Sequence, residues 1–438
     1  MIRRAVLATA LLLLATTAAF GNGRFPSAQE FHQGPGPNRD LLVARTTFGL
    51  VVSVDRGRRW EYWCEDALQY GDGYDPTLVF AADGTMLVAL EDGLLTTRDG
   101  CTFRRSPDLE SLTVRDLATS VDGRVTYALA VTRSAVPDSR VARSLDHGLT
   151  FDFVGDRFVG VVLQTIEVAG SDPLRLYASG TLDADGSALL FRSVDGGVHW
   201  VRAAAGFGEA TGVYVSGVDG RRPEVLYLRA TAAGATMDAG SADGDGVLFR
   251  SDDGGETLRE VLRTRGPMRG FALSDDGRSV WAGGPDDGVW RSVDGAAPTR
   301  FSGEPVDCLR WSDGVLWACR VFVANGPLLL RSDGEAPFVT ALSVADIGPP
   351  PGRCPAGTPA HDVCPGRWAV VRRALVPPTL LDASTDRGAV IAPTPSSACG
   401  CRAGSTSMPR GFSLAGFAFA LWQSCRRGDP RRRRAANP

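Results

Sequence analysis

The sequence contains no lysine, so arginine supplies all 47 of its basic side chains, and it contains only four histidines. These are His32, His147, His199 and His361. A Ser-His-Asp hydrolase needs a histidine base held by a carboxylate, and finger-type metal sites pair histidines with cysteines at fixed spacing. Four histidines leave little material for such a hydrolase. No cysteine pair has histidine partners at the spacing of a finger-type site, so the sequence argues against both kinds of site.

Long hydrophobic runs and long amphipathic helical periods are also scarce. An apolar stretch at residues 5–14 follows Arg3 and Arg4, and it is shorter than the roughly 20 residues that span a bilayer. Small residues continue to Ala19, which completes the layout of a secretory signal. We therefore expect residues 1–21 to be a signal peptide and the protein to be exported.

Positive charge is in deficit through the body of the chain. Residues 22–401 hold 37 arginines against 49 aspartates and glutamates, which leaves a net charge near −12. Such a surface repels polyanions, so we do not expect nucleic acid as a partner.

The chain is rich in glycine and proline, with 52 and 27 residues that fall between short apolar runs. That pattern is typical of many-stranded all-β proteins. A turn of the form S-x-D-x-G-x-x-aromatic recurs, with four good copies that begin at Ser53, Ser144, Ser193 and Ser251. Weaker copies begin at Thr97, Ser292 and Ser332. The aligned aspartates are Asp55, Asp99, Asp146, Asp195, Asp253, Asp294 and Asp333.

These aspartates are separated by 44, 47, 49, 58, 41 and 39 residues, the length of a four-stranded blade. The sequence therefore predicts a seven-bladed β-propeller with four-stranded antiparallel blades over residues 22–345. The hydroxyl and carboxylate of each turn are expected to accept backbone N–H groups, with glycine at positive φ and the aromatic ring packed back on the blade.

This turn resembles the Asp-box, or BNR repeat, of the propeller superfamily that includes sialidases, sortilin-type receptors and photosystem II assembly factors. The resemblance covers about residues 30–340 and implies that the aspartates build the fold. It also implies one catalytic alternative: Arg24, in Gly23-Arg24-Phe25-Pro26, resembles the arginine that holds the substrate carboxylate in sialidases. The other sialidase residues cannot be assigned among Arg45, Arg133, Arg229, Tyr127, Tyr177 and Tyr227.

An up-and-down meander puts the aspartate turns and the first-to-second-strand turns on one face. The longer insertions, residues 132–140, 180–187 and 231–246, join second to third strands and lie on the opposite face, which we predict to be the binding face. Candidate binding residues on its loops are Tyr70, Asp72, Tyr74, Asp183, Asp185, Asp238, Asp243 and Asp245. The acidic loops are expected to be solvated hairpins without a cofactor, with Ca²⁺ as the alternative ligand.

Export makes disulfides the first interpretation of the cysteines. Cys308 and Cys319 face each other across a two-residue Asp313–Gly314 turn, so we expect them to pair. Cys354 and Cys364 flank a short loop and are expected to pair locally, which leaves Cys64 and Cys101 for a bridge between blades.

The composition changes after the repeats. Residues 346–376 are expected to form a disulfide-bonded cap with a short helix at 367–375, and residues 377–398 a proline-rich spacer. Residues 399–438 contain Cys399 and Cys401, a short apolar stretch and an arginine cluster. They resemble the myxobacterial C-terminal sorting tail, which implies transfer to the cell surface, with a membrane contacted only through this tail.

The sequence thus favours an exported, surface-directed propeller that binds a glycan, peptide or protein at its loop face without catalysis. The alternative is a secreted exo-glycosidase of sialidase-like type, and a purely structural envelope component is the third hypothesis.

Overall fold

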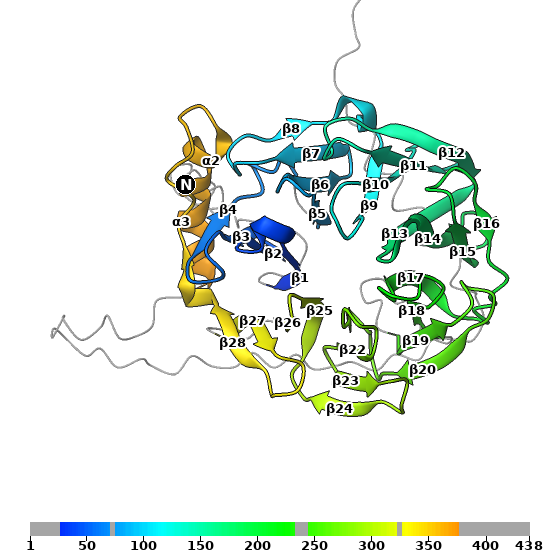
Figure 1. The fold of residues 1–438 in the computed structure, drawn as a ribbon. Helices are drawn as coiled ribbons and strands as arrows, with labels where there is room; N and C mark the ends of the chain where they lie inside the picture. Colours follow the sequence, from blue (N-terminus) through cyan, green and yellow to red (C-terminus); the bar gives the residue numbers. More distant parts are fainter. Residues whose placement is uncertain (1–26, 71–74, 233–243, 322–325, 376–438) are drawn as a thin grey trace, which may run out of the picture. The chain divides into compact units, whose positions relative to one another are not determined.

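The computed structural model describes residues 27–70, 75–232, 244–321 and 326–375. Within these ranges seven antiparallel sheets form a ring, as Figure 1 shows. Each sheet contains four consecutive strands paired in a meander, so the predicted seven-bladed β-propeller is confirmed. The first strand of each blade lies nearest the axis and the fourth lies at the rim.

The strands follow one another blade by blade. Blades 1 and 2 contain β1 (Ala28–Gln33), β2 (Leu42–Thr46), β3 (Gly49–Ser53), β4 (Trp60–Trp63), β5 (Leu78–Phe80), β6 (Met86–Leu90), β7 (Gly93–Thr97) and β8 (Arg104–Arg105). Blades 3 and 4 contain β9 (Thr113–Thr119), β10 (Thr126–Val131), β11 (Asp138–Ser144), β12 (Asp152–Val159), β13 (Val161–Ala169), β14 (Asp172–Leu182), β15 (Ala188–Ser193) and β16 (Val201–Arg202).

The remaining blades complete the ring. Blades 5 to 7 contain β17 (Thr211–Val218), β18 (Leu226–Thr231), β19 (Gly246–Ser251), β20 (Arg259–Arg263), β21 (Gly270–Leu273), β22 (Ser279–Gly284), β23 (Gly288–Val293), β24 (Thr299–Ser302), β25 (Val306–Ser312), β26 (Val315–Arg320), β27 (Pro327–Ser332) and β28 (Val339–Ser343). Short 3₁₀ turns are η1 (Gly36–Asn38), η2 (Pro107–Leu109) and η3 (Val344–Asp346).

The core lies between the blades. The second and third strands have neighbouring blades on both faces, and β6 and β10 are buried at every residue. Fourth strands such as β12 and β20 are mostly exposed. This difference explains why the middle strands read as continuous apolar runs and the rim strands do not.

The repeated turn joins the third and fourth strands of each blade. In the first copy the Ser53 hydroxyl accepts the Gly57 N–H at 2.8 Å, and Asp55 accepts the Arg59 N–H at 2.9 Å. The carboxylates of Asp99, Asp146, Asp195, Asp253 and Asp333 accept backbone N–H groups in the same way. Glycine is required in the turn of blade 3, where Gly148 has φ of 84° and a Cβ would lie 2.3 Å from Leu87 Cδ2.

The sixth turn is built differently. Asp294 itself has φ of 52°, and its carboxylate is bonded to the Arg278 guanidinium at 2.7 and 2.6 Å. No bond from a backbone N–H to this carboxylate occurs among the hydrogen bonds of the described residues.

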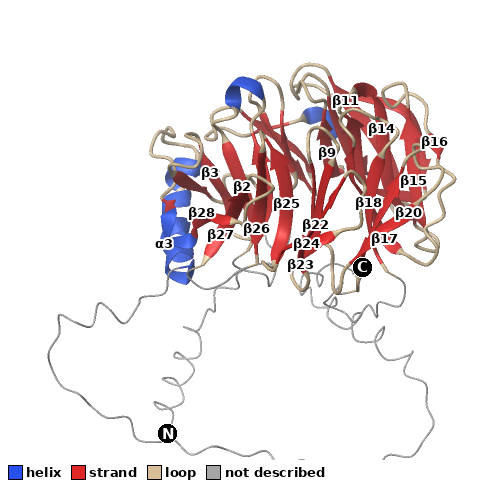
Figure 2. Cartoon of the chain, turned by 60° about the horizontal axis from the view of Figure 1, so that its bottom comes forward, coloured by secondary structure: helices blue, strands red, loops and turns tan. Residues whose placement is uncertain are grey.

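The ring is closed by a segment that follows the last blade. Strand β29 (Ile347–Gly348) pairs in parallel with β4, which gives blade 1 a fifth strand. Two helices follow, α2 (Pro359–Asp362) and α3 (Cys364–Leu375), the latter covering the predicted helix at 367–375. Figure 1 and Figure 2 show α3 at the outer edge of the ring, and Figure 1 shows it beside β4, whose Tyr62 ring lies 5.2 Å from the Trp368 ring of α3.

Three disulfides join cysteines of the described ranges, and two of them differ from the predicted pairs. Cys308 and Cys319 are joined as expected. The predictions of a local Cys354–Cys364 bond and of a Cys64–Cys101 bridge were wrong, because Cys64 is joined to Cys364 and Cys101 to Cys354. The physical reason is that the segment after blade 7 packs back on blades 1 and 2, so its cysteines meet partners from the start of the ring.

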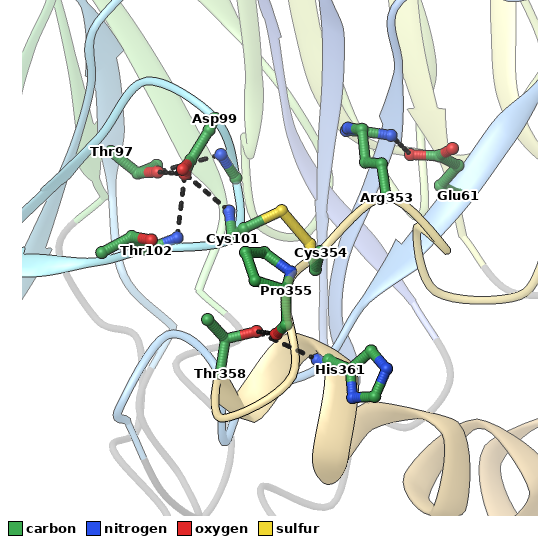
Figure 3. Close-up of a disulfide and its surroundings, with 11 residues drawn as sticks. Glu61, Thr97, Asp99, Cys101, Thr102, Arg353, Cys354, Pro355, Thr358 and His361 are labelled. Atoms are coloured by element: carbon green, nitrogen blue, oxygen red, sulfur yellow. Dashed lines mark hydrogen bonds and ion pairs between the residues drawn. A yellow bond between two sulfur atoms is a disulfide. The ribbon is translucent and has the colours of Figure 1, made fainter.

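Figure 3 shows the Cys101–Cys354 bond at the turn of blade 2, where Asp99 accepts the N–H groups of Cys101 and Thr102. Beside it Arg353 is paired with Glu61 of β4 at 2.7 Å. We refer to β29, α2, α3 and the disulfides Cys64–Cys364 and Cys101–Cys354 as the latch. Across the described ranges, no helix combines the length and the apolar character that a membrane crossing requires.

Several predictions fall outside the described residues. They are the signal peptide at 1–21, Arg24, Asp72, Tyr74, Asp238, Asp243, the spacer at 377–398, and the tail at 399–438 with Cys399 and Cys401.

Candidate functional site

A central cavity of about 830 Å³ is lined by the innermost strands of the ring. Its lining includes Thr231 and Gly246, the strand ends that flank a second-to-third-strand loop, Val321 of another such loop, and Pro267 of a blade-to-blade join. The cavity therefore reaches the face opposite the aspartate turns. This is the face that the sequence predicted for binding.

The cavity lining is charged. Its arginines are Arg45, Arg229, Arg269 and Arg310, and its acids are Glu30, Asp75, Asp116, Glu167 and Asp307. Tyr214, about 39% exposed, adds an aromatic surface. Charges of both signs on one wall suit a polar ligand that offers donors and acceptors together.

β-Bulges on the inner strands help to place these side chains. The first strands of blades 1, 3, 4, 5 and 7 each shift register against their second strands. Three polar residues skipped by these shifts, Gln29, Ser216 and Asp307, line the cavity. A bulge inserts an unpaired residue and turns it out of the alternating pattern, which is a common way to aim a side chain into a site.

One wall of the cavity is an ionised cluster centred on Glu30. Arg45 Nε lies 3.0 Å from Glu30 Oε2, and His32 Nε2 lies 3.3 Å from Oε1. Thr77, which precedes β5 of the neighbouring blade, donates to Oε1 at 3.2 Å. Burial alone would raise the pKa of Glu30, but His32, Arg45 and these hydrogen bonds together lower it to about 2. Glu30 is therefore an anion at any physiological pH.

The opposite behaviour is found at Glu167 and Asp116. Burial raises the pKa of Glu167 to about 7, although Arg310 and Arg229 lower it in part. Burial, with the negative charges of Glu167 and Glu30, raises the pKa of Asp116 well above its usual range, against the backbone N–H groups of Ile166 and Leu117 that it accepts. The cavity thus holds carboxyl groups whose protonation differs at neutral pH.

Arg229 and Tyr214 form a cross-strand pair of blade 5. Arg229 Nε donates to Ser216 Oγ at 2.9 Å, and its Nη1 donates to the Met268 carbonyl at 3.3 Å. Burial lowers the pKa of Arg229, while Tyr214, Glu30 and Glu167 oppose that shift. Arg229 is held by the scaffold, so it presents a fixed positive charge to the cavity.

Asp307 links neighbouring blades at the mouth of the cavity. Its carboxylate accepts from Ser27 Oγ at 2.8 Å and from Arg269 Nη1 at 2.6 Å. Ser27 precedes blade 1 and Arg269 precedes blade 6, so one carboxylate of blade 7 holds both neighbours.

Among the residues considered for a sialidase-like site, the cavity lining contains Arg45 and Arg229. Tyr127 and Tyr177 are buried between blades, where their hydroxyls donate to the carbonyls of Pro173 and Pro223. Tyr227 is also buried, and its hydroxyl accepts from Arg250 at 3.2 Å.

Arg133, also considered for that site, is bonded instead to Thr113 and to the Glu91 carbonyl. The structure therefore brings Arg45 and Arg229 to one cavity and places the other four side chains elsewhere. Tyr214, Glu167 and Arg310 were missed by sequence reasoning, and no local motif marks them.

The candidate binding residues predicted on the loops lie in different environments. Tyr70 packs against the core of blades 1 and 2, and burial raises its pKa well above the usual range. Asp183 and Asp185 lie in the exposed loop between β14 and β15, where Asp185 accepts from the Ser187 N–H and hydroxyl. Asp245 accepts the Gly266 N–H at 3.0 Å. In the part of the chain that the structure describes, no group of three or more His, Cys, Asp or Glu side chains is arranged to hold a metal ion.

No family model matches this chain, and no curated protein matches it. Among solved structures, the chain is similar to the GH74 enzyme of Niastella koreensis, with 15% identity and a TM-score of 0.34 over 70% of this chain and 62% of that one. It is also similar to the hydrazine synthase of Kuenenia stuttgartiensis, with 10% identity and a TM-score of 0.48 over 73% of this chain and 99% of that one.

A third similar structure is YCF48 bound to D1 peptide, with 15% identity and a TM-score of 0.34 over 54% of this chain and 69% of that one. The chain spans less than two thirds of the Niastella koreensis enzyme. At such identities these likenesses concern the fold alone.

Proposed function

We propose that this protein is an exported, non-catalytic binding module that takes the end of a glycan chain into the central cavity. The observation that carries the proposal is the cavity lining, which combines fixed carboxylates and guanidinium groups with one partly exposed tyrosine ring. Sugar hydroxyls donate and accept at once, so they are matched by neighbouring groups of both kinds. The tyrosine ring supplies the apolar face on which a sugar ring can pack.

Export and surface delivery are part of the same proposal. Three disulfides support an oxidising compartment, since such bonds persist outside the cytoplasm. The signal peptide and the sorting tail add to it from the sequence alone. A peptide or protein ligand at the same face is the alternative outcome of the binding test.

The test uses the exported protein on a glycan array, followed by calorimetric titration with the strongest ligand. Tyr214→Ser and Arg310→Gln change two exposed cavity residues, and each is expected to weaken binding at least tenfold, about 1.4 kcal/mol. Arg124→Gln is the control, because Arg124 lies in an exposed turn on the other face. Equal affinity in all four proteins, or no glycan bound at all, would remove the glycan proposal.

The second candidate is the secreted exo-glycosidase, and one observation favours the two-carboxylate kind rather than the sialidase-like kind, which uses a tyrosine nucleophile. Glu167, with its pKa raised to about 7, and Glu30, with its pKa lowered to about 2, line the same cavity. Glycosidases use a protonated carboxyl beside an ionised one. A panel of fluorogenic sialosides and other glycosides, assayed on wild type, Glu167→Gln and Arg24→Ala, separates the candidates. Turnover that either substitution abolishes would overturn the non-catalytic proposal.

A further inference from the structure

A second pocket, of about 260 Å³, lies between blades 5 and 6, away from the central cavity. Its walls come from β18, β19 and β20 on one side and from β22, β23 and the sixth aspartate turn on the other. Leu248, Val280 and Ala282 form its buried floor, and the Trp290 ring lines it. The pocket is therefore largely apolar and has room for an aromatic ring.

The other blades show what normally fills this position. Five turns keep an aromatic residue, and in three of them the ring packs on a ring from the fourth strand of the preceding blade. The three such pairs are Phe103 with Trp63, Trp200 with Phe158, and Phe338 with Phe301. All three pairs are edge-to-face, with centroids 6.3, 5.6 and 5.5 Å apart.

Blade 6 lacks this ring. Its turn ends in Ala297-Pro298-Thr299, whereas the turn of blade 7 ends in Ala336-Pro337-Phe338. Thr299 is exposed, and the facing strand β20 offers Val261 and Leu262 instead of an aromatic residue. The pocket thus corresponds to the space that blades 2, 4 and 7 fill with the aromatic ring of their own turn.

Two arginine side chains place positive charge at the wall of the pocket. Arg250 and Arg259 both approach Asp252, at 2.8 Å and 3.6 Å, so two cations share one carboxylate. Both guanidinium groups also come within about 4 Å of where a Cβ on Gly295 would lie, and Gly295 lines the pocket. Asp252 itself does not line the pocket; the acid that does, Glu260, is paired with Arg263 at 2.6 Å. One positive charge is therefore left in excess beside an apolar hollow.

We propose that this pocket binds an aromatic ring that carries a carboxylate, such as the C-terminal aromatic residue of a peptide or a free aromatic acid. The ring takes the place of the missing turn residue, and the carboxylate is paired by Arg250 and Arg259, whose planar donors match it. The proposal is independent of the glycan proposal, because no lining residue is shared between the two sites.

The test measures binding of N-acetylphenylalanine, of its amide, and of a peptide that ends in phenylalanine, by ligand-observed NMR and titration calorimetry. The acid is expected to bind at least tenfold more tightly than the amide, since the amide removes the anionic partner of the arginines. If the peptide binds more tightly than N-acetylphenylalanine, the natural ligand is a peptide end; if the two bind equally, it is a free aromatic acid. Either result supports recognition of an aromatic ring with a carboxylate.

Three variants connect the binding to the pocket. Thr299→Phe restores the ring of the repeat and is expected to abolish binding. Ala297→Trp blocks the same space from an exposed position, and Ala336→Trp, at the matched exposed position of blade 7, is expected to leave binding unchanged. Arg259→Gln is expected to weaken binding of the acid tenfold and to change binding of the amide little. Absence of binding, equal affinity for acid and amide, or binding that survives both Thr299→Phe and Ala297→Trp would overturn the proposal.

Discussion

Removing the latch disulfides tests how the ring is held closed. Cys64–Cys364 and Cys101–Cys354 span 300 and 253 residues of sequence. With one bond in place, the other closes a loop of only about 48 residues, because the path through the existing bond is short. By loop-closure entropy that bond is worth about 4 kcal/mol, whereas the first of the two to form is worth about 5.5 kcal/mol.

The perturbation is therefore a set of three variants, with Cys101→Ser/Cys354→Ser, with Cys64→Ser/Cys364→Ser, and with all four substitutions. Unfolding entropy for about 340 ordered residues is near 0.7 kcal/mol per degree, so either pair lowers Tm by about 6 °C. All four substitutions lower it by about 14 °C, more than the two pairs together. The control, Cys308→Ser/Cys319→Ser, opens a loop of only 11 residues and lowers Tm by about 4 °C.

Scanning calorimetry of the oxidised proteins measures these values, and mass spectrometry of a non-reduced digest checks the pairing in wild type. Two results would refute the reasoning. One is a digest that links Cys354 to Cys364. The other is a fourfold variant that unfolds within a few degrees of the Cys308→Ser/Cys319→Ser control, since long-range closure would then contribute little.

Three further predictions concern the cavity and the turns. The raised pKa of Glu167, from 4.5 to about 7, stabilises the fold below pH 4.5, and this contribution is lost as the pH rises through about 7. Tm of wild type should therefore fall across that window, and the slope should be smaller in Glu167→Gln; identical slopes would contradict the assignment. Asp146→Ala removes an acceptor of the Leu149 and Thr150 N–H groups, so thermal unfolding should show a loss of about 1–2 kcal/mol. Asp294→Ala, where the bonded partner is an exposed Arg278, should cost less, and an equal loss would mean that the turn hydrogen bonds are unimportant. Finally, Ca²⁺ at millimolar concentration should not raise Tm, because Asp185 and Asp245 are already engaged by local donors; a rise that saturates would favour calcium loops.

The blades were predictable because their signature is local. The hydroxyl, carboxylate and glycine of each turn act within eight residues of sequence, and their spacing counts the blades directly. The weak sixth copy was aligned correctly by position, yet Asp294 bonds Arg278 rather than the turn backbone. Loss of the second glycine in the sequence was the visible sign of that difference.

The cavity and the latch were not predictable from the same information. Glu30, Asp116, Glu167 and Tyr214 come from four different blades, so no sequence window contains two of them. The wrong Cys354–Cys364 pair was predicted from the short loop between the two residues, and Cys64–Cys101 was the pair that remained. Closure of the ring instead brings the segment after blade 7 to the start of blades 1 and 2, and this proximity has no local signal.

The latch also fixes an order of events. The four meander strands of each blade are consecutive in the chain, so they can pair as soon as their own residues have been made, whereas β29 joins blade 1 after all of them. Cys354 and Cys364 come after every blade, and their partners Cys64 and Cys101 wait in the first two. These four cysteines can therefore pair only after the segment behind blade 7 has reached blades 1 and 2, so their oxidation marks a ring that is already complete.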